Sequence, residues 1–140
     1  MSRVMAIDFG MRRIGVAVSD PLRIMASGLE TINWNGIDSE YAINRLAEIV
    51  KEMEISEIVL GRPSRTDGTV SESEEKAVLF GQLLEEKVGI KPVFRDERYT
   101  TVIASQFLRS TGVSGKNKKK VVDQVAAEII LQEYLDISRT

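Results

Sequence analysis

Three acidic residues that are far apart in the chain stand where a fold could bring their carboxylates together. Asp8 interrupts an otherwise apolar run, Glu97 follows a short apolar run, and Asp123 stands near the start of a stretch with helical periodicity. A carboxylate inside an apolar strand is costly unless it pairs with a cation or binds a metal. Mg²⁺ and Mn²⁺ prefer oxygen ligands and keep positions open for phosphate oxygens. The three acids therefore predict a divalent-metal site that acts on a phosphate.

The composition narrows the chemistry further, because the 140 residues include no cysteine and no histidine. Their absence excludes disulfides, thiolate zinc sites, cysteine or histidine nucleophiles and a histidine general base. The N-terminus lacks the pattern of a secretion signal, and no apolar run approaches the roughly 20 residues that span a bilayer. We therefore expect one cytoplasmic domain over residues 1–140, with no membrane segment.

Basic residues form a second candidate site, because cations beside a metal can bind the phosphates of a nucleic acid. The net charge is only −2, but residues 109–120 carry one arginine and four lysines and no acid. Acids instead concentrate in stretches such as 48–57 and 72–86. The candidate nucleic-acid contacts are Arg12, Arg13, Arg62, Arg65, Arg98, Lys116, Lys118, Lys119 and Lys120.

Apolar periodicity and chain breakers predict the elements that must position these residues. The predicted strands cover residues 3–9, 13–19, 26–32, 57–61 and 90–95. The predicted helices begin at Asp38 or Ser39, at the capping box of Ser71 and Glu74, near residue 104, and near Lys118, and the last helix reaches Tyr134. Residues 110–117 are predicted to form a mobile loop. The order βββαβαβαα predicts an α/β fold, a five-stranded mixed sheet with helices on both faces.

This order of elements explains how the three acids can converge. Asp8 lies late in the first strand, and Glu97 lies just past the fifth. If the two strands flank the central gap of the sheet, and the last helix packs across that edge, Asp123 reaches the same point. Ala126 and Ala127 favour this packing, because small residues let the helix approach the sheet closely.

Four motifs that carry these residues resemble the YqgF (RuvX) family over nearly the whole chain. The motifs run from Asp8 to Ala17, from Thr66 to Thr69, from Asp96 to Thr101 and from Asp123 to Leu131. The resemblance implies a ribonuclease-H-like fold and a nuclease, described either as a Holliday junction resolvase or as the enzyme that matures the 5′ end of pre-16S ribosomal RNA. It also implies that Asp8, Glu97 and Asp123 are the acidic triad, and that Arg13 and Arg98 are motif arginines.

Two departures from the family pattern leave questions open. The loop after Gly61 carries Arg62 and Arg65, where relatives are commonly less charged, which bears on substrate preference. Related resolvases of the RuvC type use four acids. Asp96 or Glu128 could be the fourth acid here, so the resemblance leaves the choice between one and two metal ions open.

Each signal also has an ordinary structural explanation. Asp8 could cap its own turn, Asp123 could interact with a helix dipole, and the charged residues of 97–98 and 116–120 could simply face solvent. The Asp-x-Gly turn also opens the phosphate-binding hairpin of actin- and hexokinase-like ATPases, but 140 residues cannot supply the two domains that those proteins need. A nucleic-acid-binding module without catalysis is a further alternative, which the presence of all three acids disfavours.

The substrate is expected to be structured RNA or branched DNA. A junction resolvase needs a two-fold dimer, because it cuts two strands at symmetric points. No long apolar stripe remains for a dimer interface once the core faces of the helices are assigned, and the acidic helices would repel one another. We therefore expect a monomer or weak homodimer, and we place processing of the 5′ end of pre-16S rRNA, with Mg²⁺ or Mn²⁺, ahead of junction resolution.

Overall fold

The computed structural model describes residues 2–62, 72–96 and 116–138, and only the backbone of residues 62, 73, 96 and 116–123. The elements are β1 (Arg3–Phe9), β2 (Arg13–Ser19), β3 (Ala26–Asn33), α1 (Glu40–Glu52), β4 (Ile55–Arg62), α2 (Glu72–Val88), β5 (Val93–Asp96) and α4 (Lys116–Ser138).

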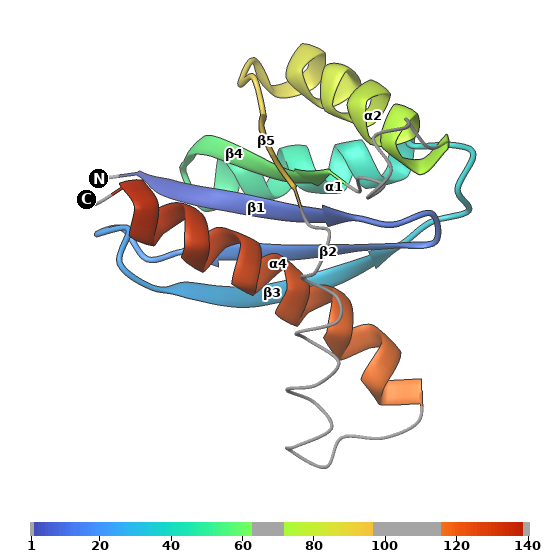
Figure 1. Cartoon of the computed structure of the whole chain (residues 1–140). Helices are drawn as coiled ribbons and strands as arrows, with labels where there is room; N and C mark the ends of the chain where they lie inside the picture. Colours follow the sequence, from blue (N-terminus) through green and yellow to red (C-terminus); the bar gives the residue numbers. More distant parts are fainter. Residues whose placement is uncertain (1, 63–71, 97–115, 139–140) are drawn as a thin grey trace.

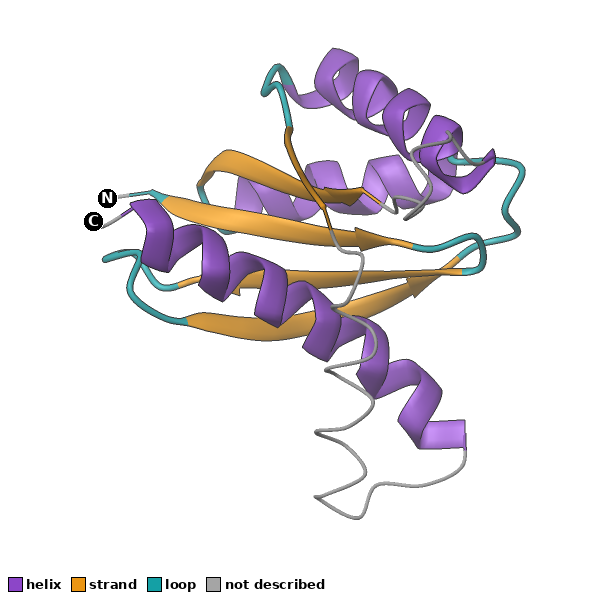
Figure 2. Cartoon of the chain, in the orientation of Figure 1, coloured by secondary structure: helices purple, strands orange, loops and turns teal. Residues whose placement is uncertain are grey.

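The strands form one mixed sheet in the order β3-β2-β1-β4-β5. β1, β2 and β3 form an antiparallel meander, whereas β4 runs parallel to both β1 and β5. Helices α1 and α2 cover one face of the sheet, and α4 crosses the other face (Figures 1 and 2). The predicted five-stranded sheet with helices on both faces is therefore confirmed.

β1 lies at the centre of the sheet, and its side chains alternate between two hydrophobic cores. Met5, Ile7 and Phe9 pack in the larger core under α1 and α2. Val4 and Ala6 pack in the smaller core under α4, together with Ala127. By the same alternation, Asp8 belongs to the α4 face. The sheet therefore presents the acid beneath the last helix.

Most predicted boundaries agree closely with the structure. β1 and β2 have the predicted bounds, while β4 begins two residues before and ends one residue after the predicted 57–61. α4 begins at Lys116, so residues 116 and 117 are helical and do not belong to the predicted loop, because lysine is a good helix former once Gly115 has been passed. The predicted Ser71 cap, the short helix near residue 104 and the rest of the predicted loop lie outside the described residues.

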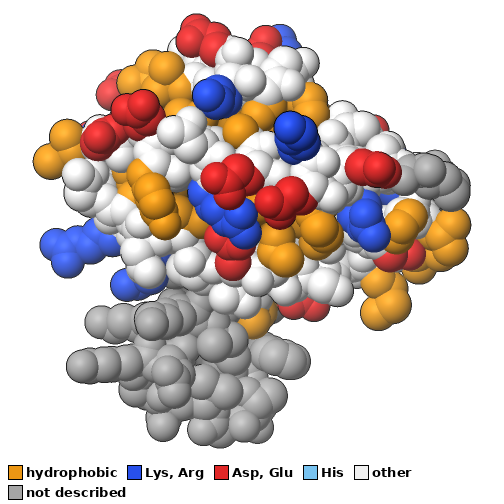
Figure 3. Space-filling view, turned by 180° about the vertical axis from the view of Figure 1, so that it is seen from behind, with side chains coloured by type: hydrophobic (Ala, Val, Ile, Leu, Met, Phe, Trp, Pro, Cys, Tyr) orange, Lys and Arg blue, Asp and Glu red, His pale blue; other side chains and the backbone are white. Residues whose placement is uncertain are grey.

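Among the described helices, none is both long and apolar enough to cross a lipid bilayer. On the face shown in Figure 3, acidic and basic side chains of the described residues lie next to one another, with hydrophobic side chains between them. This face therefore carries no large patch of a single charge over its described part.

Candidate active site

Asp8 lies in a row of residues that runs across the sheet where the parallel strands end. Its register partners are Gly15 in β2 and Gly61 in β4, and Gly61 is in turn the partner of Arg95 in β5. Register partners point to the same face of a sheet, so the row faces α4. The Asp8 carboxylate thus shares its face with the Arg95 side chain.

The two glycines leave space around a buried carboxylate. Asp8 is 7% exposed, which is unusual for an acid. Because Gly15 and Gly61 have no side chains, neither neighbour in the row covers it, and a ligand or another backbone can approach closely. The Cα atoms of Asp8 and Arg95 are two strand spacings apart, about 10 Å.

The turn after Asp8 is fixed by Trp34. The indole Nε1 of Trp34 donates a hydrogen bond of 2.8 Å to the carbonyl oxygen of Gly10, and its backbone N–H donates one of 3.0 Å to the carbonyl oxygen of Arg12. A Cβ atom on Gly10 would collide with the carbonyl oxygen of Arg13, so only glycine fits the turn. The turn therefore holds Arg12, which is exposed, in a defined place beside the end of β1.

α4 crosses the sheet at the level of Asp8. Gln124 Nε2 donates a hydrogen bond of 3.2 Å to Thr31 Oγ1, and Thr31 is the register partner of Gly15 in the Asp8 row. Gly28 permits this approach, because a Cβ atom there would lie 3.3 Å from Cβ of Gln124. The backbone of Asp123 immediately precedes Gln124. The predicted packing role of Ala126 and Ala127 agrees with their complete burial.

The structure describes the predicted acids to different extents. The side chain of Asp8 is described, Asp123 is described by its backbone in α4, and Glu97 lies outside the described residues, directly after β5. Over residues 2–62, 72–96 and 116–138, the described acidic side chains include no group of three placed to hold a metal ion. Convergence of the triad stays a prediction. Of the two possible fourth acids, Asp96 ends β5 and Glu128 is partly buried on α4.

The predicted basic contacts fall at three places. Arg12 is exposed in the turn, Arg13 begins β2 and is partly buried, and the backbone of Arg62 ends β4. Arg65 and Arg98 lie outside the described residues. The remaining four are placed by their backbone in the first two turns of α4: Lys116, Lys118, Lys119 and Lys120. The lysine run is thus helical in its entirety.

Sequence reasoning missed Arg95 as a candidate site residue. Its side chain is partly buried, and in the described part of the chain no hydrogen bond or ion pair holds its guanidinium group. Phe94 packs in the larger core, so alternation along β5 sends Arg95 to the Asp8 face. The alternation is visible in the sequence, but the register that aligns residue 95 with Gly61 and Asp8 is not.

Comparisons with known proteins agree with this geometry. The family model described as "RuvX: Holliday junction resolvase" matches residues 2–137. A "Putative pre-16S rRNA nuclease" of Ligilactobacillus salivarius (strain UCC118) is 44% identical over 137 residues, which cover 97% of this chain and 93% of that protein. A protein of the same name from Acetivibrio thermocellus is 44% identical over 135 residues, covering 96% of this chain and 95% of that one.

The fold also resembles a solved structure, "T. thermophilus RuvC in complex with Holliday junction substrate". The TM-score is 0.60 at 11% sequence identity, and the match covers 99% of this chain and 97% of that one. This likeness confirms the predicted ribonuclease-H-like fold. Together, the family match over residues 2–137 and relatives at 44% identity show that the chain belongs to the RuvX (YqgF) family.

Proposed function

We propose that this protein is a divalent-metal-dependent nuclease that processes the 5′ end of pre-16S rRNA, and therefore works in the cytoplasm. The observation that carries the proposal is the setting of Asp8, a buried carboxylate at the end of a central strand with glycine on both neighbouring strands. The names of relatives at 44% identity support cleavage as the reaction and an rRNA precursor as the substrate.

The available donors suit Mg²⁺ or Mn²⁺. The chain has no cysteine or histidine, so its side-chain ligands for a catalytic metal are restricted to oxygen, which hard divalent cations prefer. Gly15 and Gly61 leave the space beside Asp8 free of neighbouring side chains in its row. We infer that Asp8, Glu97 and Asp123 hold the ion. When bound, such an ion makes an attacking water more acidic and offsets the charge that develops on the phosphate.

The residues around Asp8 would bind and orient the nucleic acid. Asp8 sits on the rigid centre of the sheet, which fixes the position of its carboxylate. Arg95 lies on the same face of the sheet as Asp8 and could bind a phosphate through its planar guanidinium group. Arg12, on the turn held by Trp34, and the lysines of α4 at 118–120 would bind phosphates on either side of the cleaved bond. A monomer suffices for such cutting of one strand.

Resolution of four-way DNA junctions is the second candidate. The description of the matching family model as a Holliday junction resolvase favours it. This activity requires two active sites related by a two-fold axis. A nucleic-acid-binding module without catalysis is the third candidate, and the buried carboxylate of Asp8 disfavours it, because a binding module has no need of a desolvated acid.

One assay separates the three candidates. The full chain is offered a labelled 5′ segment of the rRNA precursor and, in parallel, a four-way DNA junction, each with Mg²⁺ and with Mn²⁺. Asp8→Asn serves as the blank. We expect metal-dependent cleavage of the RNA by the wild-type protein and none by the variant. Paired symmetric nicks in the junction with the RNA intact would instead establish the resolvase, and binding without any cleavage would establish the module.

A further inference from the structure

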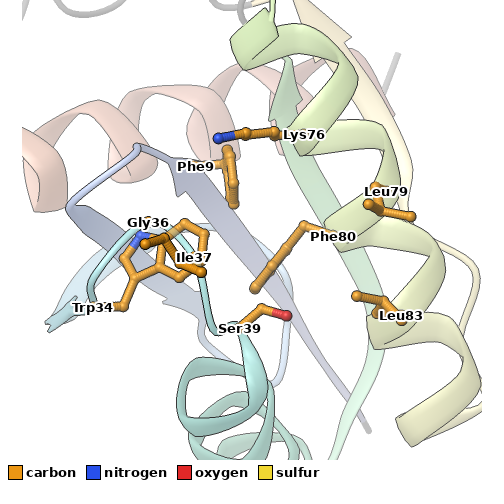
Figure 4. A pocket seen from close by; sticks show the side chains of 9 residues that line it. All are labelled: Phe9, Trp34, Gly36, Ile37, Ser39, Lys76, Leu79, Phe80 and Leu83. Carbon is orange, nitrogen blue, oxygen red and sulfur yellow. The ribbon is translucent and has the colours of Figure 1, made fainter.

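A pocket of about 250 Å³ lies on the opposite face of the sheet from Asp8, between the end of β1, the chain that enters α1 and the exposed side of α2 (Figure 4). The residues that line this pocket, which we call the Trp34 pocket, are Phe9, Trp34, Gly36, Ile37, Ser39, Lys76, Leu79, Phe80 and Leu83. Neither the acidic triad nor the predicted basic contacts include any of them.

Three aromatic rings form the inner wall of the Trp34 pocket. The ring centroids of Phe9 and Trp34 are 5.5 Å apart, those of Phe9 and Phe80 are 5.0 Å apart, and those of Trp34 and Phe80 are 6.2 Å apart. Phe9 and Phe80 belong to the core, whereas Trp34 is only partly buried. A partly open aromatic wall of this kind offers a π-face on which another ring can stack.

The outer wall of the pocket exposes aliphatic side chains to water, which is unfavourable for the free energy of folding. Ile37 is 89% exposed and Leu79 is 55% exposed, although each has a large apolar surface. The conformation around Ile37 is well fixed, because Asn35 Oδ1 accepts hydrogen bonds of 2.8 Å from the backbone N–H groups of both Ile37 and Asp38. Exposed apolar residues that border a hollow, one on a fixed loop and one on a helix, indicate a binding site.

The Trp34 pocket and the candidate active site lie on opposite faces of the sheet, on either side of the turn that follows β1. Phe9, which lines the pocket, follows Asp8 in β1, and the two side chains point to opposite faces of the sheet. Between the two faces runs the turn that exposes Arg12, and the indole of Trp34 is hydrogen-bonded to that turn at Gly10. A nucleic-acid strand that leaves Asp8 over this edge therefore meets first a cation and then the pocket.

Charge around the Trp34 pocket favours approach from the side of the turn. Lys76 extends from α2 over Phe9 at the mouth (Figure 4), and its ion pair of 3.3 Å with Glu72 is solvent-exposed and therefore weak. Beyond Ser39 and Leu83, the charged residues that line the adjoining hollow are Asp38, Glu40, Glu86 and Lys87, so acids outnumber bases there. The net negative charge of that hollow disfavours a phosphate there, whereas the charged residue that lines the Trp34 pocket is a cation, Lys76.

We propose that the Trp34 pocket binds one unstacked nucleobase of the substrate strand, a few nucleotides from the bond that is cut. Base stacking on an aromatic side chain tolerates any base, because every base has a π-face. The pocket would thus anchor single-stranded RNA beside a structured region without reading its sequence. This inference rests on the proposed function, because it takes the strand held at Asp8 to be the ligand.

Trp34 is the single tryptophan of the chain, so tryptophan fluorescence reports on the pocket and on the turn that the indole holds. We would titrate the full-length Asp8→Asn variant, in EDTA to prevent cleavage, with a single-stranded RNA from the precursor 5′ segment. The matched probe is the same RNA with abasic sites in place of its bases. We expect the intact RNA to quench Trp34 and to bind about tenfold more tightly than the abasic RNA, which retains every phosphate.

Two substitutions locate the effect. Ile37→Ser should reduce affinity for the intact RNA several-fold and leave affinity for the abasic RNA unchanged. Ile24 is 44% exposed at the other end of the sheet, so Ile24→Ser makes the same chemical change away from the pocket. It should leave the affinities for both RNAs unchanged. Equal quenching by both RNAs would contradict nucleobase binding in the pocket. Equal affinity of Ile37→Ser and Ile24→Ser for the intact RNA would contradict it as well, and is the result expected if the pocket binds an apolar protein segment instead.

Failure of the pocket and failure of the proposed function give different results. If the wild-type protein cleaves the RNA but shows no preference for intact over abasic RNA, the proposed nucleobase binding is wrong and the proposed nuclease activity is supported. If base-dependent quenching occurs but neither Mg²⁺ nor Mn²⁺ supports cleavage, nucleobase binding is supported and the proposed nuclease activity is wrong.

Discussion

Asp8 and Arg95 lie in the same row of the sheet and on the same face, with only the backbone of Gly61 between them. An acid that holds a metal ion and an arginine that binds a phosphate are both useful to a nuclease when they can reach the same phosphodiester. The parallel pairing of β1 with β4 and of β4 with β5 creates this relationship, because it ends all three strands at one edge of the sheet.

Replacement of Arg95 tests this relationship. Arg95→Gln should weaken RNA binding and reduce the slope of log affinity against log salt by about 0.7, the value for one phosphate of a single strand that the protein no longer neutralises. Lys51→Gln removes an exposed charge from the last turn of α1 and serves as the control. Equal slopes for Arg95→Gln and the wild type would place Arg95 away from the phosphates.

The lysines of α4 provide a second test of the path of the nucleic acid. Changing Lys118, Lys119 and Lys120 to Ala should weaken binding and flatten the salt dependence by roughly 0.7–0.9 for each phosphate that the lysines had neutralised. Alanine preserves the helix, because its helix propensity is at least that of lysine. Circular dichroism checks that α4 remains intact. If the slope does not change, the lysine run serves as a solvated helix face.

The stability of Asp8→Asn tests whether the buried acid is retained for function. Asparagine has nearly the same shape as aspartate but no charge, and burial of a carboxylate is destabilising. The proposed metal site would add repulsion from Glu97 and Asp123 when no ion is bound. In EDTA, the variant should melt at or above the temperature of the wild-type protein. Added Mg²⁺ should raise the melting temperature of the wild type only, because a ligand stabilises the state that binds it. A variant that melts well below the wild type in EDTA would show that Asp8 is structural.

Much of the fold was predictable because β1 and β2 are strongly patterned. Their bounds follow from the apolar runs on either side of Gly10, and α1 follows from its apolar spacing around Ala42 and Leu46. Relative placement of the strands was harder. The expected convergence of the acids was conditional on strands one and five flanking a central gap, whereas β4 lies between them. The sequence pattern of a strand–helix–strand crossover does not tell whether the second strand lies next to the first or one strand further away.

The candidate site was predictable only in part, because the order and register of the strands are not visible in the sequence. An acid in an apolar run identifies Asp8, and its burial agrees with that interpretation. Arg95 and the Trp34 pocket depend on strand register and on the contacts of the loop at 33–39, which bring together residues with no fixed spacing in the sequence. Trp34 packs against the larger core, and its hydrogen bonds to the carbonyl oxygens of Gly10 and Arg12 also fix the turn after β1.

Acid stability should depend on Asp20, which lies at the end of the sheet remote from Asp8. Its Oδ1 accepts hydrogen bonds from the backbone N–H groups of Met25 (3.0 Å) and Ile24 (2.7 Å), and these lower the pKa of Asp20 below its usual 3.8. A lowered pKa contributes stability that is full above the usual pKa and is lost as the pH falls through the lowered value. Asp20→Ala should therefore melt below the wild type at pH 7, with a difference that narrows below about pH 3.8. A difference that is constant from pH 7 to pH 2 would contradict this role.

The central claim is that Asp8 carries a metal-dependent cleavage reaction, and single-turnover cleavage of the precursor 5′ segment over a Mg²⁺ titration tests it most directly. The account predicts that the wild-type rate rises with Mg²⁺ and saturates. It also predicts that folded Asp8→Asn is slower by at least about 100-fold at every concentration, as expected when a ligand of a catalytic metal is removed. Cleavage by Asp8→Asn at the wild-type rate, or wild-type cleavage that persists in EDTA, would contradict the account.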